Sequence, residues 1–238
     1  MKVLITNDDG VDAPQLLPLI RWCRKLGDVT VVVPKREQSA KSHSIEIRKP
    51  MEIRQRELEP GITVWTVDST PADCVRFAVS GLKEHFDLVI SGINRGFNLG
   101  QDTLYSGTVA AASEAIIKGI PAIALSTSIK YYDHAVHHLD SIFGYIQENE
   151  LMKYHSFYNI NIPVAPKGFR ITRLGGASFS EEFVPQENDL YFPGGKPLHS
   201  DGSNSELDTD AMVHGFISIT PMTIDRTAKD IFEKLNTC

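Results

Sequence analysis

The sequence predicts an α/β protein in which a mostly parallel β-sheet lies between two layers of helices. Short apolar runs rich in Val and Ile alternate with longer amphipathic stretches, as strands and helices do in successive βαβ units. The first run, residues 2–6, is apolar through its centre, which is typical of a parallel strand buried on both faces. It ends abruptly in the polar residues 7–10.

The predicted strands are the apolar, β-branched runs that end in a polar or turn-forming residue. They cover residues 2–6, 29–33, 64–67, 88–91, 121–126 and 157–162, with a further strand at 216–220. Because βαβ connections are right-handed, the strands in the first two-thirds of the chain are expected to lie parallel in one sheet.

The helices between these strands are predicted from capping residues and from apolar side chains at three- and four-residue spacing. The first is expected to run from Asp12 to a stop at Gly27. The second begins at Thr70, which can cap it, with Pro71 in the first turn and Asp73 where a capping-box acid belongs. Three more are expected: an alanine-rich helix opened by residues 105–108, a helix from residue 133 and a short terminal helix at 225–235.

The chain has 238 residues and a formal net charge of −6, so it fits one domain with an appendage and is not a basic nucleic-acid binder. No apolar run approaches the ~20 residues of a membrane span, and Asn7 comes too early for a signal-peptide core. We therefore expect a cytoplasmic protein with no membrane partner and no stable nucleic-acid complex. Cys23, Cys74 and Cys238 lack zinc-ligand spacing and are expected to be reduced, the first two of them buried.

The composition changes after residue 163, which divides the chain into an α/β core (1–163) and a C-terminal arm (164–238) of hairpins, a strand and a short helix. Gly, Ser, Pro, Asn and Asp crowd residues 168–210, interrupted by aromatic residues such as Phe183 and Phe192. Arms of this kind pack either on a partner subunit or on a small core of their own, and the sequence does not choose between the two.

Polar residues follow three of the predicted strands at the point where each strand ends. Residues 7–10 follow the first strand, 36–39 the second and 91–94 the fourth. Parallel sheets bind ligands beyond the carboxyl ends of their strands. We therefore expect these three clusters to meet at one site.

Asp8 and Asp9 are adjacent acids in the first of these clusters. Like charges at close range each favour the neutral form of the other, and a divalent cation removes that conflict. With the Ser39 hydroxyl and the Asn94 amide oxygen they would form an all-oxygen site, which suits Mg²⁺ or Mn²⁺ better than Zn²⁺. The alternative, that this Asp-Asp-Gly sequence is a simple turn, is weakened by the other two clusters.

An anion site is predicted where the alanine-rich helix begins. Ser106, Gly107 and Thr108 would place backbone N–H groups and two hydroxyls beside the positive end of the helix dipole, so phosphate is the natural ligand. An ordinary helix cap is the alternative. Neither a P-loop signature nor a strand-linked GxGxxG occurs, which argues against a P-loop NTPase and against a standard dinucleotide site.

His43 lies close to Ser39 in the sequence and is a candidate proton donor or phosphate contact, with a polar surface histidine as the alternative. His134, His137 and His138 are assigned to a solvated helix face, because no acidic partner motif accompanies them.

Several short segments of the chain form a recognisable set. In chain order they are ITNDDG at 5–10, SAKSHS at 39–44, TPADC at 70–74, SGINRG at 91–96, NLG at 98–100, YSGTV at 105–109, NINIP at 159–163 and GFISITP at 215–221. This set resembles the SurE family, the survival-protein nucleotidases, over nearly the whole chain. The family usually has glycine where this chain has Ser42 and Ser69.

The resemblance implies a Rossmann-like three-layer sandwich and a metal-dependent phosphomonoesterase that acts on nucleoside 5′- or 3′-monophosphates. It implies a C-terminal arm used in dimer or tetramer assembly, so a homodimer or homotetramer is expected. The implied metal ligands are Asp8, Asp9, Ser39 and Asn94, and the implied phosphate-binding residues are Asn98, Ser106, Gly107 and Thr108.

We expect in-line attack of water on the phosphate, oriented by Asp8 or Asp9 and assisted by one Mg²⁺ or Mn²⁺ per subunit. Attack by Asp8 itself, to give an aspartyl-phosphate, is the rival mechanism. Two other functions stay open. One is a nucleotide sensor or scaffold without useful turnover, and the other is a broad phosphatase or exopolyphosphatase.

Overall fold

A computed structural model describes every residue except 178–179, 197, 199–201, 203, 205 and 237–238. Cys238 therefore lies outside the described residues. The strands are β1 (Lys2–Thr6), β2 (Asp28–Pro34), β3 (Ile53–Glu59), β4 (Ile62–Val67), β5 (Leu88–Arg95), β6 (Ala122–Thr127), β7 (Phe157–Ile162), β8 (Phe169–Ile171), β9 (Glu182–Pro185), β10 (Tyr191–Gly194) and β11 (Ile217–Pro221). The α-helices are α1 (Leu16–Cys23), α2 (Pro71–Arg76), α3 (Gly107–Ile117), α4 (Leu139–Glu148), α5 (Leu151–Tyr154), α6 (Asp208–Val213) and α7 (Lys229–Asn236).

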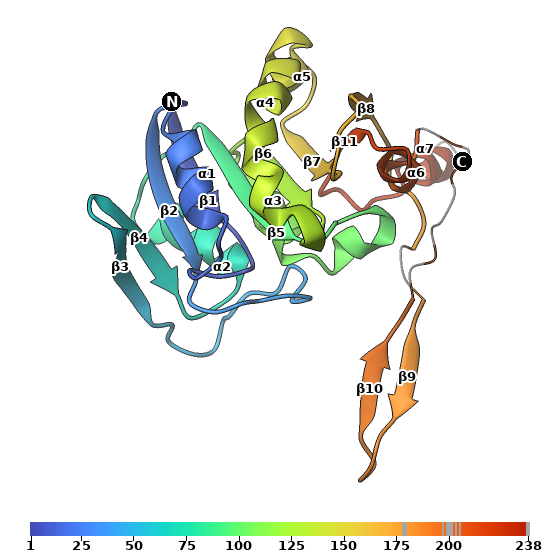
Figure 1. Ribbon diagram of the computed structural model, residues 1–238, viewed down its shortest axis with the longest axis horizontal. Coiled ribbons are helices and arrows are strands. Elements are labelled where there is room, and N and C mark those ends of the chain that lie inside the picture. The colour runs from blue at the N-terminus through green and yellow to red at the C-terminus, as the bar shows by residue number, and fades with distance from the viewer. Residues whose placement is uncertain (178–179, 197, 199–201, 203, 205, 237–238) are drawn as a thin grey trace.

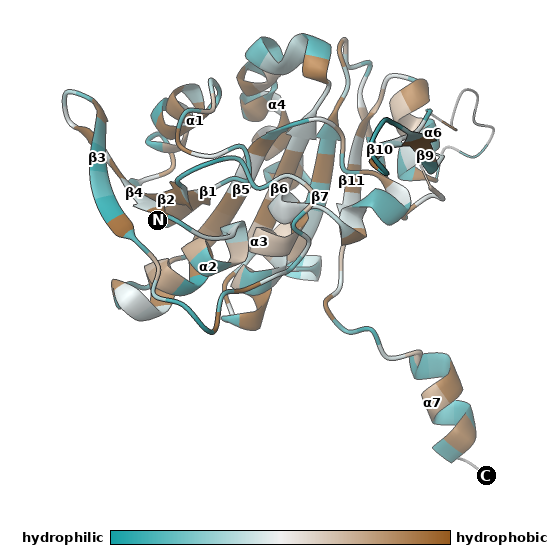
Figure 2. Cartoon of the chain, turned by 90° about the horizontal axis from the view of Figure 1, so that it is seen from below, coloured by the Kyte–Doolittle hydropathy of each residue, from teal (hydrophilic) through white to brown (hydrophobic). Residues whose placement is uncertain are grey.

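Nine strands form one central sheet in the order β3-β4-β2-β1-β5-β6-β7-β11-β8 (Figure 1). From β4 to β7 all neighbours pair in parallel, whereas β3 pairs antiparallel with β4 and β11 antiparallel with β7. Helices α1 and α4 cover one face of this sheet and α2 and α3 cover the other (Figure 2). The structure thus confirms the predicted α/β sandwich with a mostly parallel sheet.

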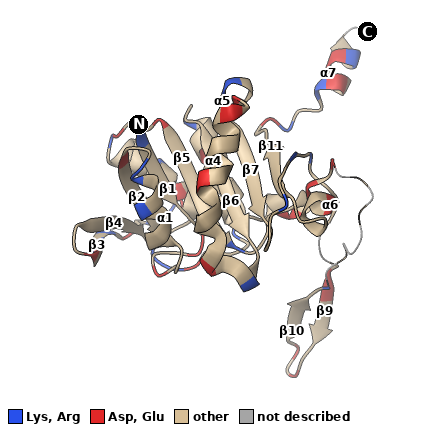
Figure 3. Ribbon diagram, turned by 45° about the horizontal axis from the view of Figure 1, so that its top comes forward, with Lys and Arg blue, Asp and Glu red and all other residues tan. Residues whose placement is uncertain are grey.

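The core consists of two apolar layers, one on each face of the sheet. Leu16, Leu19 and Ile20 of α1 pack in the first layer with Ile142 of α4. In the second layer the small side chains of α3, including Ala111, let this helix lie close to the strands. The middle of the sheet is almost free of charged side chains (Figure 3), as expected for parallel strands covered on both faces. Cys23 and Cys74 are buried and free, as predicted.

The first helix is shorter than predicted. It begins at Leu16 rather than Asp12, because the preceding residues form turns in which the Val11 N–H donates to the Pro34 carbonyl. It ends at Cys23, so Gly27 does not stop it. Gly27 has φ +146°, and a Cβ there would lie 2.0 Å from the Met1 carbonyl oxygen, so the residue permits a close approach of two backbone segments.

Two other elements differ from the sequence prediction. Strand β3 was not predicted, because an edge strand needs few apolar residues and this one carries mostly charged side chains. The helix expected from residue 133 begins later, at Leu139, because residues 129–138 form 3₁₀-helical turns instead.

The region after residue 163 both completes the sheet and extends from it. Strands β8 and β11 belong to the central sheet. The β9–β10 hairpin and helix α7 extend away from it (Figures 1 and 2), and their apolar side chains, such as Phe192 and Phe232, are exposed. The division at residue 163 stays a prediction. Within the described part of the chain, no helix has the length and apolar character needed to cross a membrane.

Because the central strands are buried on both faces, truncating one of their side chains should destabilise the protein strongly. Leu4 in β1 is fully buried, whereas Ile47 is 75% exposed. Leu4→Ala should lower the free energy of unfolding by about 2–5 kcal/mol, through lost burial and the cavity left behind. Ile47→Ala, the control, should change it by less than about 0.5 kcal/mol. Urea unfolding followed by circular dichroism measures both, and equal losses would contradict the assignment of the core.

Candidate active site

A tight turn after β1 places the two adjacent acids. The Asn7 amide donates to the Gly10 carbonyl (2.9 Å), and the Gly10 N–H donates back to the Asn7 side-chain oxygen (3.1 Å). Gly10 has φ +87°, a backbone conformation that favours glycine. This reciprocal pair closes the turn, so Asp8 and Asp9 emerge at fixed positions beyond the carboxyl end of the strand.

Asp8 lies buried against the start of α3. The Thr108 hydroxyl donates to Asp8 Oδ1 (2.5 Å). A Cβ at Gly107 would lie 2.9 Å from the Asp8 Cβ and 3.0 Å from its Oδ2, so only glycine fits beside this carboxylate. Ser106 is the helix N-cap, since its hydroxyl accepts from the Val109 N–H (3.1 Å). The predicted anion-binding turn therefore already faces an anion, the Asp8 carboxylate.

Asp9 is held by groups from two other elements. Its Oδ2 accepts from the Arg95 backbone N–H (3.1 Å) and from the Tyr132 hydroxyl (3.3 Å). Tyr132 comes from the 3₁₀-helical residues 129–138 and was not identified from the sequence. Nothing in its local pattern distinguishes it from a core tyrosine.

Burial makes the ionised forms of both acids costly. It raises the pKa of Asp8 from 3.8 to about 6, with the hydrogen bond from Thr108 opposing the rise and the charge of Asp9 adding to it. Burial likewise raises the pKa of Asp9, against the hydrogen bonds from Arg95 and Tyr132. A neighbouring cation would favour the ionised forms of both carboxylates.

Asn94 is turned toward this site by an irregularity in β5. Ser91 pairs with Ala124 and Asn94 with Ser126, so β5 has one residue more than β6 over this stretch. Such bulges re-aim side chains near functional sites. The Asn94 amide nitrogen donates to the Gly96 carbonyl (2.9 Å), which leaves its side-chain oxygen to accept or to bind a cation.

Ser39 reaches the site from the segment after β2. The N–H of the preceding Gln38 donates to the Asp8 carbonyl (2.7 Å), which ties this segment to the turn after β1. The Ser39 hydroxyl donates to Glu37 Oε1 (2.6 Å). Its oxygen keeps acceptor capacity beyond that bond.

One cavity of about 230 Å³ joins Asp8, Ser39 and Asn94, whereas Asp9 is not among the residues that line it. It is lined by Asp8, Ser39, Ala40, Asn94, Arg95, Asn98, Asp102, Tyr105 and Ser106. The structure thus brings together residues that the sequence assigned to metal and phosphate binding. Arg95, Asp102 and Tyr105 were not identified as site residues from the sequence. Arg95 ends β5, Asp102 lies in a 3₁₀ turn and Tyr105 follows that turn, and only the fold brings all three to the cavity.

Asn98 is held in position by side chains of strand β7. Its backbone N–H donates to the Asn161 side chain (2.9 Å), and its carbonyl accepts from the amides of Asn159 (2.8 Å) and Asn161 (2.9 Å). Its own amide donates to the Ser126 hydroxyl (2.8 Å). The asparagines of β7 therefore fix the loop that carries Asn98.

His43 is not among the residues that line this cavity. Its Nε2 lies 3.0 Å from Glu114 Oε2, and both side chains line a separate cavity of about 510 Å³. Thr108 and Gly107 do not line the first cavity either, since both lie against Asp8. The roles predicted for these three residues in phosphate binding stay predictions.

The residues that surround the cavity fit a hard divalent cation. Among the described residues, no three or more His, Cys, Asp and Glu side chains gather in a way that could hold a metal. The cavity offers instead the Asp8 carboxylate with the oxygens of Asn94 and Ser39, while Asp9, the next residue in the chain, lies outside its lining. An all-oxygen set of this kind suits Mg²⁺ or Mn²⁺ and not Zn²⁺.

Comparisons with known proteins identify the family to which the chain belongs. The profile of the family described as "Survival protein SurE" matches residues 3–181. Proteins named 5′-nucleotidase SurE are 40% identical in Pelotomaculum thermopropionicum, over 99% of this chain and 94% of theirs, and 38% identical in Clostridium beijerinckii, over 95% and 94%. The crystal structure of SurE protein from Aquifex aeolicus superposes with a TM-score of 0.83 at 30% identity, covering 100% of this chain and 99% of that one. The chain therefore belongs to the SurE family.

Proposed function

We propose that this protein is a metal-dependent 5′-nucleotidase, which hydrolyses nucleoside 5′-monophosphates to nucleoside and phosphate. The observation that supports this most strongly is the single cavity that joins Asp8, Ser39 and Asn94 beside the start of α3. Relatives that match almost the full chain bear the name 5′-nucleotidase SurE. Nucleoside 3′-monophosphates are the second substrate class to test.

One divalent cation per subunit would be held by Asp8, Asp9, Ser39 and Asn94. The chemistry that such a cation supplies is neutralisation of charge on the phosphate and a lowered pKa of water. The raised pKa values of the two acids support this assignment, because a neighbouring cation favours the ionised carboxylates. Mg²⁺ and Mn²⁺ both suit the ligands.

The phosphate would lie in the same cavity, against side chains that donate hydrogen bonds. The Asn98 amide and the Ser106 hydroxyl line it, and the Arg95 side chain brings a positive charge. Donors fixed in advance stabilise the charge that develops on the phosphate oxygens during transfer. Asn98 is fixed in this sense, because the asparagines of β7 hold its backbone.

Hydrolysis would proceed by in-line attack of water on phosphorus, with the nucleoside leaving as its alcohol. A carboxylate oxygen of Asp8 or Asp9 would accept a hydrogen bond from this water and so orient it. Direct attack by Asp8 is disfavoured, because a carboxylate that binds the cation would be a poorer nucleophile. Rapid quenching with labelled substrate distinguishes the two routes, since only direct attack leaves phosphate on the protein.

Phosphate release should depend on a divalent cation. Purified protein incubated with a panel of nucleoside 5′- and 3′-monophosphates should release phosphate with Mn²⁺ or Mg²⁺. Excess EDTA should prevent this release, because it removes the cation that would neutralise charge on the phosphate. Colorimetric phosphate detection measures this. Comparing kcat/KM across nucleotides, simple phosphomonoesters and polyphosphate identifies the preferred class.

Two outcomes of this panel would contradict the proposal. Nucleotide binding without release under either cation would indicate a sensor or scaffold. A higher kcat/KM for polyphosphate or for simple phosphomonoesters than for any nucleotide would indicate a broad phosphatase.

Replacing Asp8 by Asn should remove most of the activity and stabilise the metal-free protein. Because the pKa of Asp8 is about 6 when folded and 3.8 when unfolded, the folded state binds the proton more tightly. Stability of the metal-free protein therefore falls as the pH rises from about 4 to 6, and the full cost persists above 6. At pH 7.5 and in EDTA, Asp8→Asn should melt a few degrees higher than the parent, because no buried carboxylate has to be ionised. With Mn²⁺ or Mg²⁺ present, its kcat/KM should fall at least about 100-fold.

Asp12→Asn is the matched control. The Asp12 side chain is 75% exposed and pairs with Arg56 at the surface, so this variant should keep the parent's melting temperature and activity. Differential scanning calorimetry with and without Mn²⁺ gives the comparison. A metal-free Asp8→Asn protein that melts below its parent would show that this carboxylate stabilises the fold.

The exposed apolar faces of the hairpin and of α7 support assembly with further copies of the chain, as a homodimer or homotetramer. No residue of α7 is buried, although Ile231, Phe232 and Leu235 lie on it. Light scattering during gel filtration should give at least twice the 26.4 kDa of one chain. Phe232→Asp should lower that mass, whereas Tyr154→Asp, at an exposed aromatic residue of α5, should not. A monomeric parent would refute this assembly.

A further inference from the structure

The segment that carries Ser39 has no regular secondary structure, and its backbone adopts energetically unfavourable φ angles. Residues 35–50, here called the Ser39 loop, contain no helix or strand. Ala40 and Ser42 both have positive φ, +55° and +53°, which residues with side chains rarely adopt. Such conformations persist only when surrounding contacts hold them. The position of the Ser39 hydroxyl therefore depends on what fastens this loop.

Contacts near the cavity fasten only part of the Ser39 loop. The Gln38 N–H donates to the Asp8 carbonyl (2.7 Å). Ser42 donates through its N–H to the Tyr105 carbonyl (2.9 Å) and through its hydroxyl to the Leu104 carbonyl (2.6 Å). The residues of the loop after Ser42 do not line the cavity and are held by other contacts.

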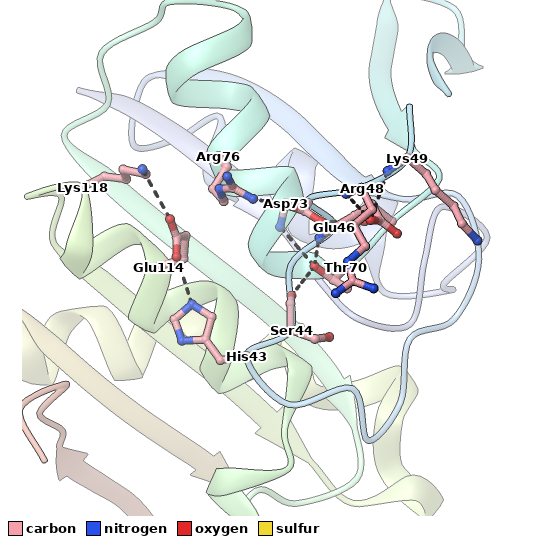
Figure 4. A network of polar contacts seen from close by, with 11 residues as sticks. His43, Ser44, Glu46, Arg48, Lys49, Thr70, Asp73, Arg76, Glu114 and Lys118 are labelled. Carbon is pink, nitrogen blue, oxygen red and sulfur yellow. Dashed lines mark hydrogen bonds and ion pairs between the residues drawn. The ribbon is translucent and has the colours of Figure 1, made fainter. Parts of the chain in front are cut away.

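Glu114 is one of these anchors. It lies on α3, its side chain is 8% exposed, and its Oε2 lies 3.0 Å from His43 Nε2 (Figure 4). Its other oxygen lies 3.5 Å from the Lys118 ammonium. Helix α3 thus holds Asp8 through Thr108 at its first turn and the Ser39 loop through Glu114 further along. Helix α3 therefore sets the distance between Asp8 and the Ser39 loop.

Asp73 on α2 is the second anchor. Its Oδ2 accepts from the Glu46 N–H (2.8 Å) and from the Ser69 hydroxyl (2.6 Å), and its Oδ1 from Arg76 (2.6 Å). The hydroxyl of Thr70, which caps α2, donates to the Ser44 carbonyl (2.7 Å). Figure 4 shows both anchors on one side of the loop, each from a helix of the same layer.

We propose that Glu114, through His43, and Asp73, through the Glu46 amide, are positioning residues that hold Ser39 at the cation site. The inference rests on the proposed function, because it assigns Ser39 as a ligand. Neither anchor lines the cavity, so both act through the loop. His43 accordingly serves the site as the link to Glu114.

The test is calorimetric titration of Mn²⁺ into the metal-free full-length protein, which needs no turnover. Glu114→Ala should weaken Mn²⁺ binding about tenfold, the lower end of the loss that follows removal of groups that orient metal ligands, because Glu114 acts on Ser39 only through His43 and the loop. Glu114→Gln should bind like the parent, because its amide oxygen still accepts from His43. Lys118→Met is the matched control, since Lys118 contacts the same carboxylate without touching the loop, and it should leave Mn²⁺ binding unchanged.

His43→Ala provides a second route should Glu114→Ala fail to fold, because it removes the same link from the loop side. It should weaken Mn²⁺ binding by a similar factor. Each single variant is also combined with Ser39→Ala. If the link between Glu114 and His43 acts through Ser39, neither Glu114→Ala nor His43→Ala weakens Mn²⁺ binding further once the hydroxyl is gone.

The outcomes separate this inference from the proposed function. Equal weakening by His43→Ala with and without Ser39 would show that the link does not act through this hydroxyl, and would overturn the positioning role. Parent-like Mn²⁺ binding by His43→Ala would overturn it as well. Both results leave the nucleotidase activity of the parent intact. A parent that binds no Mn²⁺ and releases no phosphate would overturn the proposed function and this inference together.

Discussion

Two adjacent carboxylates at the end of a buried strand impose the main constraint on this molecule. Asp8 and Asp9 follow β1, at the centre of the sheet, where burial raises the pKa of both. Their surroundings are built to keep them there. Asn7 and Gly10 close the turn, and the start of α3 lies against Asp8 so closely that its first residue must be glycine. A cation bound beside these carboxylates would offset the cost of ionising them, and this is the basis of the proposed metal centre.

The other groups of the site are supplied by segments far apart in the sequence, and the helices and strands around them set their positions. Helix α3 contacts both Asp8 and the Ser39 loop. The asparagines of β7 hold the loop that carries Asn98. Asp208 of α6 accepts from the Gly100 N–H (2.8 Å), so the C-terminal region fastens the same loop. The cavity therefore depends on elements from the whole length of the chain.

Much of the fold and part of the site could be predicted from the sequence, because they depend on local patterns. Buried parallel strands are apolar runs, and their carboxyl ends locate Asp8, Ser39 and Asn94 at one edge. Tyr132 and Glu114 could not be predicted, since a hydroxyl on Asp9 and a carboxylate on His43 are tertiary contacts between distant segments.

Strand β3 was not predicted for a different reason. It lies at the edge of the sheet, where a strand needs few apolar residues, so its sequence lacks an apolar run. The roles of Ser42 and Ser69 become clear only from the structure. Ser42 keeps a left-handed backbone, and both hydroxyls donate hydrogen bonds that fasten the Ser39 loop or its anchor.

The most direct test of the metal centre is anomalous diffraction from crystals of the protein soaked in Mn²⁺. One strong anomalous peak per subunit is expected, within binding distance of the carboxylates of Asp8 and Asp9 and the side-chain oxygens of Asn94 and Ser39. The same soak of Asp8→Asn crystals should lose that peak. Manganese bound elsewhere, with none between the two carboxylates of the parent, would contradict the proposed metal centre.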